Sequence, residues 1–347
     1  MPFRAYNLAR NNENMGLRVI IPVAGVGTRL RPHTHTAPKV MLQVAGKPMI
    51  GHILDELRKY DVEEITLVVG HLGDAIRDYV TRAYDFKFQF VTQEELKGLG
   101  HAIWMTGDLY RKVQSPLLVI LGDTIFDADF KAIIGSDSNY IGVKEVEDGR
   151  RFGIVELEGD QIVSMVEKPE HPPTNLAIVG IYYFTDGRML YKCLDEVVEK
   201  GVTTKGEIQL TDALALMLKQ GARMKPFVIE GWYDCGKPET LLSTNQILLS
   251  KNTTATNGQP EERNGSLIMH PVSIGKDAVL ENSIVGPYVT VAEGSTIRNS
   301  VIKNSIVSSH CLVENMLLDA SIIADHAKVQ GTYRQLNVGD SSEIRLG

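Results

Sequence analysis

Short apolar runs alternate with amphipathic segments over residues 17–250 of this 347-residue chain. The apolar runs predict strands at RVIIPVAG (18–25), EITLVVGH (64–71), KFQFVTQ (87–93) and PLLVILGD (116–123), and helical spacing between them predicts helices over 48–62, 72–84 and 100–112. This order predicts an α/β fold with a Rossmann-like, mostly parallel sheet covered by helices. Ligands of such sheets bind at the carboxyl ends of strands, where AGVGTR, VTQ and LGD all fall.

A different pattern follows residues 251–265, a polar stretch with Gly and Pro that we expect to be a linker. Aliphatic residues then recur at intervals of six, with Gly and Asn in the gaps. The series comprises Val279, Val285, Val291 and Ile297, then, after a slip, Val301, Val307 and Val313, and finally Ile323 and Val329. This period predicts a short left-handed parallel β-helix of hexapeptides over residues 266–347, with an irregular β-sandwich as the alternative.

Composition and charge narrow the class of protein. The net charge is −7 and no run of basic residues is longer than two, so no nucleic-acid partner is expected; no run of eighteen apolar residues exists, so no membrane span is expected. Cys193, Cys235 and Cys311 form no CxxC pair, which favours reduced thiols and a cytoplasmic location. Residues 1–16 form a polar N-terminal extension without the apolar core of a signal peptide, and Met15 is a candidate natural start.

The glycine-rich stretch AGVGTRLRPHTHTAPK (24–39) carries the candidate chemistry. It begins like the dinucleotide fingerprint, but Leu30 stands where the third glycine belongs, and the Walker pattern fails at 45–48, where no Ser or Thr follows the lysine. What remains is a flexible turn whose backbone amides face phosphate oxygens, with charge supplied by Arg29 and Lys39. A structural turn with solvated charges is the alternative.

Together with later motifs, this stretch resembles the sugar-1-phosphate nucleotidyltransferase family, whose pattern is GxGTRLxP followed by PK. The family's order continues through VMLQVAGKPMI, KGLGHAI, LGDTIF, RFGIVE, VEKP, NLAIVGIYYF, GEIQLTDAL and WYDCGKPE. The resemblance covers residues 17–250, is strongest to long-form glucose-1-phosphate thymidylyltransferases, and includes the C-terminal β-helix as a known appendage. Val26 departs from the pattern, since many members carry glycine there, but its amide can still donate.

The resemblance implies that an NTP reacts with a sugar 1-phosphate to give an NDP-sugar and pyrophosphate. A phosphate oxygen attacks the α-phosphorus in line, so the chemistry needs positioning and charge neutralisation rather than a Ser, Cys or His nucleophile. Because two anions meet, Mg²⁺ is the expected cofactor, and it needs only one or two carboxylates. Asp123 and Asp234 match the family's metal-binding aspartates.

The resemblance also assigns roles to other residues. Arg29 and Lys39 match the residues that hold the β and γ phosphates, and Lys168 matches the lysine that contacts the sugar phosphate, so these three are the expected catalytic residues. The expected nucleotide-binding residues are Ala24, Gly25, Val26, Gly27, Thr28, Arg29, Gln93, Gly98 and Leu99. The expected sugar-phosphate residues are Gly153, Glu167, Lys168, Asn175, Ile178, Gly180 and Glu207, with a salt bridge as the alternative role of Glu207.

The choice of base depends on the segment VTQEELKGLGHAI. Gln93 has a donor and an acceptor that can pair with the O4/N3–H edge of thymine or uracil, and Gly98 and Leu99 match the base-contacting pair of pyrimidine-specific members. We therefore expect a pyrimidine nucleotide. The ending GWYDCGKPETLL and the hexapeptide tail resemble the longer glucose-1-phosphate thymidylyltransferases, so we expect dTTP before UTP, with glucose 1-phosphate as the sugar substrate and a homo-oligomer formed through the β-helix. The alternatives are a UTP–glucose-1-phosphate uridylyltransferase, a bifunctional nucleotidyltransferase/acetyltransferase using His310 or His326, and a non-catalytic subunit that senses NDP-sugars.

Overall fold

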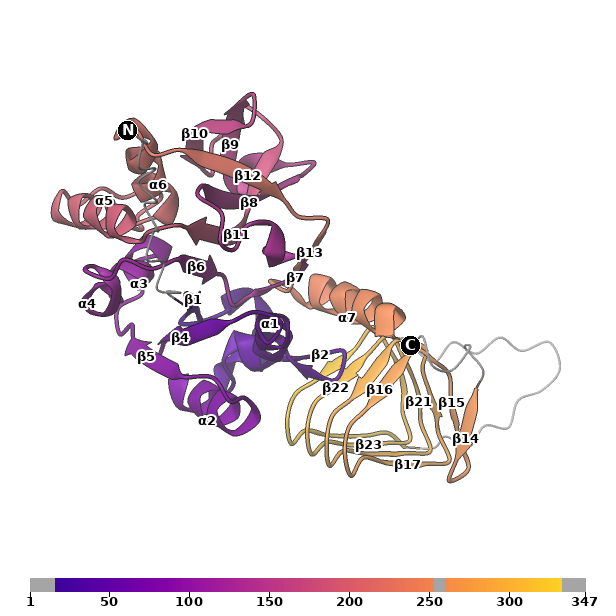
Figure 1. Cartoon of the computed structure of the whole chain (residues 1–347). Coiled ribbons are helices and arrows are strands. Elements are labelled where there is room, and N and C mark those ends of the chain that lie inside the picture. The colour runs from indigo at the N-terminus through magenta and orange to yellow at the C-terminus, as the bar shows by residue number, and fades with distance from the viewer. Residues whose placement is uncertain (1–15, 253–259, 333–347) are drawn as a thin grey trace, which may run out of the picture. The chain divides into compact units, whose positions relative to one another are not determined.

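The computed structural model describes residues 16–252 and 260–332, and the chain divides into two compact units (Figure 1). The first unit comprises Met1–Leu42 and Pro48–Lys237, and the second comprises Gln43–Lys47 and Pro238–Gly347. The division therefore lies before the boundary expected at residue 250. The reason is that helix α7 (Pro238–Asn252) contacts the short strand β2 (Gln43–Val44) and the C-terminal strands.

The segment expected to be a linker is partly regular in structure. Helix α7 ends at Asn252, and strand β14 (Glu261–Arg263) pairs with β15 (Ser266–Ile268). Residues 253–259 and most of the N-terminal extension, with Met15, lie outside the described residues.

The first unit is built on a nine-stranded sheet with the order β10-β9-β11-β6-β1-β4-β5, in which β8 also pairs with β11, and β12 pairs with β8. The strands are β1 (Leu17–Pro22), β4 (Val62–Val69), β5 (Phe88–Thr92), β6 (Leu117–Ile120), β8 (Asn139–Glu145), β9 (Gly153–Glu158), β10 (Gln161–Glu167), β11 (Leu176–Phe184) and β12 (Met224–Val228). Strands β5, β4, β1 and β6 are parallel, which confirms the predicted Rossmann-like arrangement. Strand β11 joins β6 antiparallel, so the other half of the sheet is mixed.

Helices cover both faces of this sheet, which explains why its strands read as continuous apolar runs. Val19 and Ile21 of β1 pack with α1 (Met49–Leu57) and α2 (Gly73–Ala83), whereas Ile20 packs on the opposite face. The opposite face is covered by α3 (Leu99–Trp104), α4 (Gly107–Tyr110), α5 (Arg188–Glu199) and α6 (Leu210–Lys219).

The helix expected over 100–112 is divided into α3 and α4 at Thr106. The Thr106 hydroxyl donates to the carbonyl of Ile103 at 2.7 Å and lies 2.6 Å from the hydroxyl of Tyr191. A threonine side chain that bonds its own backbone competes with the helical ladder, so the apolar periodicity continues while the helix is interrupted.

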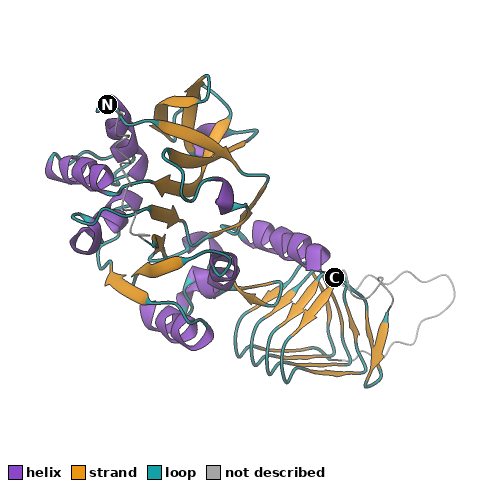
Figure 2. Ribbon diagram, in the orientation of Figure 1, coloured by secondary structure: helices purple, strands orange, loops and turns teal. Residues whose placement is uncertain are grey.

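The second unit is a short parallel β-helix of three sheets in the described part of the chain (Figure 2). One sheet joins β15, β18 (Ile284–Val285), β21 (Val301–Lys303) and β24 (Leu317–Asp319), with β14 at its edge. The second joins β16 (Val272–Ile274), β19 (Val289–Val291), β22 (Ile306–Val307) and β25 (Ile322–Ile323), and the third joins β17 (Val279–Glu281), β20 (Thr296–Arg298), β23 (Leu312–Glu314) and β26 (Lys328–Gln330).

The coils are shorter than three strict hexapeptides. Equivalent residues of adjacent coils lie 17 positions apart between Ser283 and Ser300, and 16 apart between Ser300 and Met316. Inward-facing aliphatics consequently recur at intervals of five or six, and the slip in the sequence marks a five-residue side. Val279 and Val301, which belong to the six-residue series, are each 37% exposed, while Leu280 and Ile302 occupy the core.

The corners of the β-helix explain the asparagines between the aliphatic residues. Asn282, Asn299 and Asn315 all have positive φ angles and occupy equivalent corners of successive coils. Among residues with a side chain, Asn enters this left-handed region most readily. In the described part of the chain, no helix combines the length and apolarity needed to cross a membrane.

Candidate active site

The glycine-rich loop and Asp123 follow adjacent parallel strands at the point where the chain order of the sheet reverses. The chain runs from β1 outward to β4 and β5, and then returns to β6 on the other side of β1. The crevice at the carboxyl ends of two such strands is the usual ligand site of an open α/β sheet. The topology therefore brings residues 24–29 and Asp123 to one place.

Gly27 gives the loop its shape. Its φ is +65°, and its carbonyl accepts hydrogen bonds from the Thr34 hydroxyl and the Leu30 amide, each at 2.9 Å. A Cβ at Gly27 would lie 3.0 Å from the Cβ of Lys39, and together with the positive φ this tight contact disfavours a side chain. Val26 is 43% exposed and points away from this packing, which explains how the loop accepts a valine there.

A cleft of about 560 Å³, which we call the first cleft, runs beside this loop. Its lining includes Lys39, Asp123 and Glu207. It also includes every residue predicted to bind the nucleotide, namely Ala24, Gly25, Val26, Gly27, Thr28, Arg29, Gln93, Gly98 and Leu99. The structure thus brings the whole predicted nucleotide set to a single surface.

Gln93 is held in a defined orientation in the first cleft. Its Nε2 donates to the carbonyl of Gly98 at 3.3 Å and lies 3.2 Å from Nδ1 of His101. Burial lowers the pKa of His101, and the positive charge of Lys97 lowers this pKa further against the opposing charge of Glu95, which favours the neutral ring, whose Nδ1 can accept. Gly98 has a φ of +106°, and a Cβ there would meet the Ile208 carbonyl oxygen at 2.6 Å.

A second cleft, of about 640 Å³, continues from the first. The two share Arg29, Leu99, Leu121, Asp123 and Glu207 as lining residues. The second cleft contains six of the predicted sugar-phosphate residues and Asp234: Gly153, Glu167, Lys168, Ile178, Gly180 and Glu207. Ligands in the two clefts would therefore meet at Arg29 and Asp123.

Asn175, predicted as a sugar-phosphate residue, does not line either cleft. It is exposed and precedes β11, where its carbonyl accepts from the amide of Val146 at 2.9 Å. Residues further along β11 line the cleft, namely Ile178, Val179, Gly180 and Tyr182. Asn175 is close in sequence to Ile178 and Gly180 but not close to the cleft, because β11 starts outside the site and runs into it.

Glu167 and Lys168 are fixed by contacts within the second cleft. The Thr211 hydroxyl donates to Glu167 Oε2 at 2.7 Å, and Lys168 Nζ lies 3.2 Å from Glu167 Oε1. Lys168 has a φ of +43°, and its amide donates to the carbonyl of Phe152 at 3.0 Å. A lysine rarely adopts this backbone conformation, and such strain is typical of functional sites.

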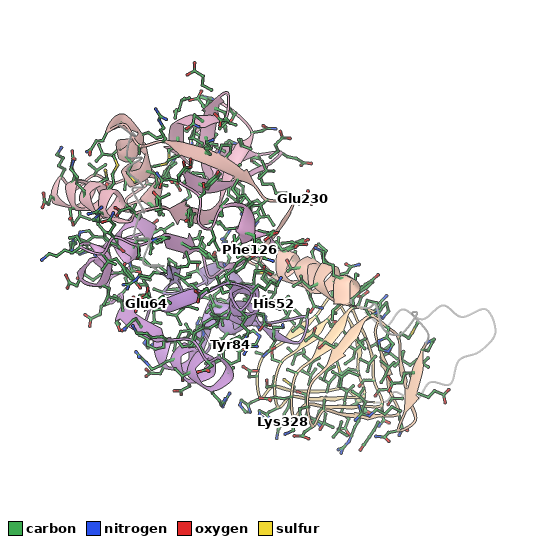
Figure 3. All side chains as sticks on the ribbon, in the orientation of Figure 1. His52, Glu64, Tyr84, Phe126, Glu230 and Lys328 are labelled. Atoms are coloured by element: carbon green, nitrogen blue, oxygen red, sulfur yellow. The ribbon has the colours of Figure 1, made fainter. Side chains whose placement is uncertain are left out.

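The two aspartates lie at neighbouring positions on different segments. Strand β7 (Thr124–Asp127) directly follows Asp123 and pairs with β13 (Gly231–Asp234), so that Asp234 is opposite Thr124. Phe126, labelled in Figure 3, anchors this ribbon, with its ring centroid 5.6 Å from that of Phe130.

Positive charge is built into the same place. Lys39 Nζ lies 2.7 Å from Asp123 Oδ2, and the lysine side chain is only 8% exposed. A Cβ on Gly236 would lie 2.8 Å from Asp234 Oδ1 and 2.9 Å from Nη2 of Arg29, so this glycine leaves room for the guanidinium beside the carboxylate. The two predicted phosphate-holding cations thus each lie close to a predicted metal-binding aspartate.

Comparison with known proteins agrees with this geometry. Residues 18–251 match the family model described as nucleotidyl transferase. The chain belongs to the nucleotidyl transferase family. The predicted membership among sugar-1-phosphate nucleotidyltransferases is confirmed by named relatives and by solved structures.

One relative is the low-salt glycan biosynthesis nucleotidyltransferase Agl11 of Haloferax volcanii, 28% identical over 95% of this chain and all of the relative. A glucose-1-phosphate thymidylyltransferase of Streptomyces griseus is 26% identical over 95% of this chain and 99% of its own. The bifunctional protein GlmU of Methanocaldococcus jannaschii is 36% identical, but over 70% of this chain and 57% of its own length. A UDP-glucose pyrophosphorylase solved with UDP-glucose has a TM-score of 0.59 and 29% identity, and covers 69% of this chain and all of that one.

The donor set of this nucleotidyl transferase fits a hard divalent cation. No group of three or more His, Cys, Asp or Glu residues in the described ranges could enclose a metal. Asp123 and Asp234 nevertheless line one cleft, and two carboxylates are sufficient for Mg²⁺, which keeps several waters and binds substrate phosphates.

Sequence reasoning left several lining residues of the second cleft without a role. They are Thr124, Arg150, Arg151, Phe152, Lys205, Gln209, Thr211 and Trp232. Trp232 packs edge-on against Phe152 with centroids 5.1 Å apart, and its buried indole N–H has no hydrogen-bond partner among the described residues. Its position two residues before Asp234 is the one signal in the sequence that could have placed it here.

Proposed function

We propose that this nucleotidyl transferase moves the thymidylyl group of dTTP to glucose 1-phosphate, releasing pyrophosphate and forming dTDP-glucose. The observation that carries the proposal is the pair of joined clefts. One contains the glycine loop and Gln93, the other contains Glu167 and Lys168, and they meet at Arg29 and Asp123.

In the proposed reaction, an anionic oxygen of glucose 1-phosphate forms a bond to the α-phosphorus of dTTP. The bond between that phosphorus and the bridging oxygen breaks, and the electron pair leaves with pyrophosphate. No proton has to be removed from the nucleophile, so the protein's contribution is orientation and charge stabilisation. Arg29 and Lys39 hold the β and γ phosphates and stabilise the pyrophosphate as it departs.

Residues of the second cleft orient the nucleophile. Lys168 binds the sugar phosphate, and Glu167, fixed by Thr211, accepts hydrogen bonds from sugar hydroxyls. Asp123 and Asp234 would hold Mg²⁺, which supplies neutralisation of phosphate charge when bound.

Thymine is favoured on two grounds. The Nε2 of Gln93 is engaged by Gly98 and His101, which leaves its Oε1 to accept from the N3–H of a pyrimidine, and the thymidylyltransferase relative spans almost the whole chain, C-terminal part included. UTP is the second candidate, because a solved structure that contains UDP-glucose shares the fold at 29% identity. A purely sensory subunit is disfavoured, since Arg29, Lys39, Asp123, Lys168 and Asp234 are all present at the clefts.

The test is pyrophosphate release from the full chain with Mg²⁺ and glucose 1-phosphate, with dTTP, UTP, GTP, CTP and ATP offered separately. The proposal predicts the highest kcat/KM for dTTP. A preference for UTP would indicate that the same residues catalyse UDP-glucose synthesis, and it would overturn the choice of base. Turnover only with the 1-phosphates of mannose, galactose or N-acetylglucosamine would overturn the choice of sugar.

A further inference from the structure

The hairpin of β2 (Gln43–Val44) and β3 (Lys47–Pro48) has an uncommon turn. Its two turn residues, Ala45 and Gly46, have φ angles of +47° and +92°. Turns with two positive φ angles normally take Asn, Asp or Gly at the first position. Alanine has no side chain that compensates this conformation, so the turn persists only where its surroundings hold it.

Asn245, on helix α7, is the residue that holds it. Its side chain is buried, and its Oδ1 accepts from the amide of Ala45 at 2.8 Å and from the hydroxyl of Thr290 at 2.6 Å. Its Nδ2 donates to the carbonyl of Tyr288 at 3.3 Å. A buried network of this kind fixes one arrangement of its members, because any displacement leaves a polar group without a partner.

The hairpin is joined to Lys39 through a short, hydrogen-bonded stretch of backbone. Lys39–Met41 forms one 3-10 turn, in which the Lys39 carbonyl accepts from the amide of Leu42 at 3.1 Å. The Leu42 carbonyl in turn accepts from the amide of Met49 at 3.2 Å, which closes the base of the hairpin. The backbone between Lys39 and the Ala45 turn, which Asn245 holds, therefore has few torsion angles that are free to change.

We propose that Asn245 is a positioning residue for the nucleotidyl transfer reaction. Asn245 fixes the Ala45 turn and thereby the conformation of the chain that follows Lys39. That conformation in turn determines where the Lys39 ammonium lies. The inference rests on the role of Lys39 in the proposed function, and Asn245 itself touches no substrate.

The test is a set of initial rates with the NTP that the wild-type chain turns over. For Asn245→Ala we expect the KM for NTP to rise about tenfold, the effect of removing one buried acceptor, with the KM for sugar 1-phosphate unchanged. Thr290→Val should raise the KM for NTP by a smaller factor. Thr290→Ser, which keeps the hydroxyl, should leave the KM for NTP at the wild-type value. The matched control is Val313→Ala on β23, which lowers the unfolding temperature through a core cavity but leaves the KM for NTP unchanged.

A rescue distinguishes positioning from a loss of stability. Adding Ala45→Gly to Asn245→Ala should restore most of the affinity for NTP, because glycine adopts the positive φ without support. A wild-type KM in folded Asn245→Ala would overturn the proposal, as would an absence of rescue. Should Asn245→Ala fail to fold, equal constants for Thr290→Val and Thr290→Ser would overturn it instead.

Lys39→Ala separates this inference from the function on which it rests. A wild-type KM for NTP in Lys39→Ala would overturn the role of Lys39, and the positioning proposal with it. An increased KM in Lys39→Ala with no change in Asn245→Ala would overturn the positioning proposal alone.

Discussion

At Gly98 the backbone and the packing both exclude a side chain, and the carbonyl that orients Gln93 is on the same residue. We expect Gly98→Ala to raise the KM for NTP about tenfold or more. The added Cβ would clash with the Ile208 carbonyl oxygen, and the shift this causes must displace the Gly98 carbonyl that accepts the hydrogen bond from Gln93. The measurement is the KM for NTP at saturating sugar 1-phosphate. Gly135→Ala is the matched control, because Gly135 also has a positive φ but no atom within 4 Å of the added Cβ. It should lose stability and keep its KM; equal KM changes in both variants would contradict the account.

Asp212, in the first turn of α6, is a residue whose charge opposes folding. Burial is the main reason that its pKa is raised, and the negative charge of Glu167 raises it further, while the hydrogen bond from Thr204 acts in the other direction. A carboxyl group whose pKa is higher in the folded state contributes to the free energy of unfolding. The contribution is complete at pH values below the unfolded-state pKa, and it is lost as pH rises through the folded-state pKa.

Asp212→Asn should therefore be more stable than the wild type at about pH 7.5, with the difference shrinking toward about pH 4. Asparagine retains an acceptor for Thr204, so the comparison isolates the charge. Urea unfolding at a series of pH values measures the difference in the free energy of unfolding between the variant and the wild type. A variant that is less stable than the wild type at neutral pH would contradict this interpretation.

Much of the site could be predicted residue by residue because the glycine loop is continuous in sequence. Its turn needs Gly27 for a positive φ, and the charges that follow it have to face the same ligand. The place of Trp232 in the cleft could not be predicted, because an aromatic side chain carries no signal in the sequence of whether its indole N–H has a hydrogen-bond partner. The structure supplies that information.

Among elements, the corners of the β-helix offer a stabilising substitution. Ala320 has a φ of +47° at the corner that Asn304 occupies one coil earlier. Replacing it with Asn or Gly should raise the free energy of unfolding by about 1 kcal/mol, because alanine is strained in the left-handed region.

Thermal unfolding of the full chain measures this effect. Ala324→Gly is the control, since Ala324 is not among the positive-φ residues and should lose stability through the greater freedom of the unfolded chain. A gain in both variants, or in neither, would contradict the explanation from backbone strain.

Element type was easier to predict than element boundaries. The helix expected over 100–112 is interrupted because Thr106 bonds its own backbone, which apolar spacing does not reveal. The six-residue period predicted the β-helix, but its members Val279 and Val301 lie outside the core, because some sides of the coils have five residues and others have six.

At the scale of the whole molecule, the sequence predicted a boundary where composition changes, whereas the structure divides the chain where contacts change. The hairpin at Gln43–Lys47 belongs to the C-terminal unit although it lies deep in the N-terminal sequence. Long-range contacts of this kind, such as Ala45 with Asn245, leave no local pattern. The expected homo-oligomer remains a prediction, and light scattering on the full chain would test it.

The joined clefts, to which we assign nucleotidyl transfer, meet at Asp123. The most direct measurement is pyrophosphate release by Asp123→Asn with Mg²⁺, the preferred NTP and sugar 1-phosphate, beside Asp127→Asn as the neighbouring control outside both clefts. We predict that Asp123→Asn folds but loses about a hundredfold or more in kcat, while Asp127→Asn keeps wild-type turnover. Near-normal turnover in Asp123→Asn would contradict the account.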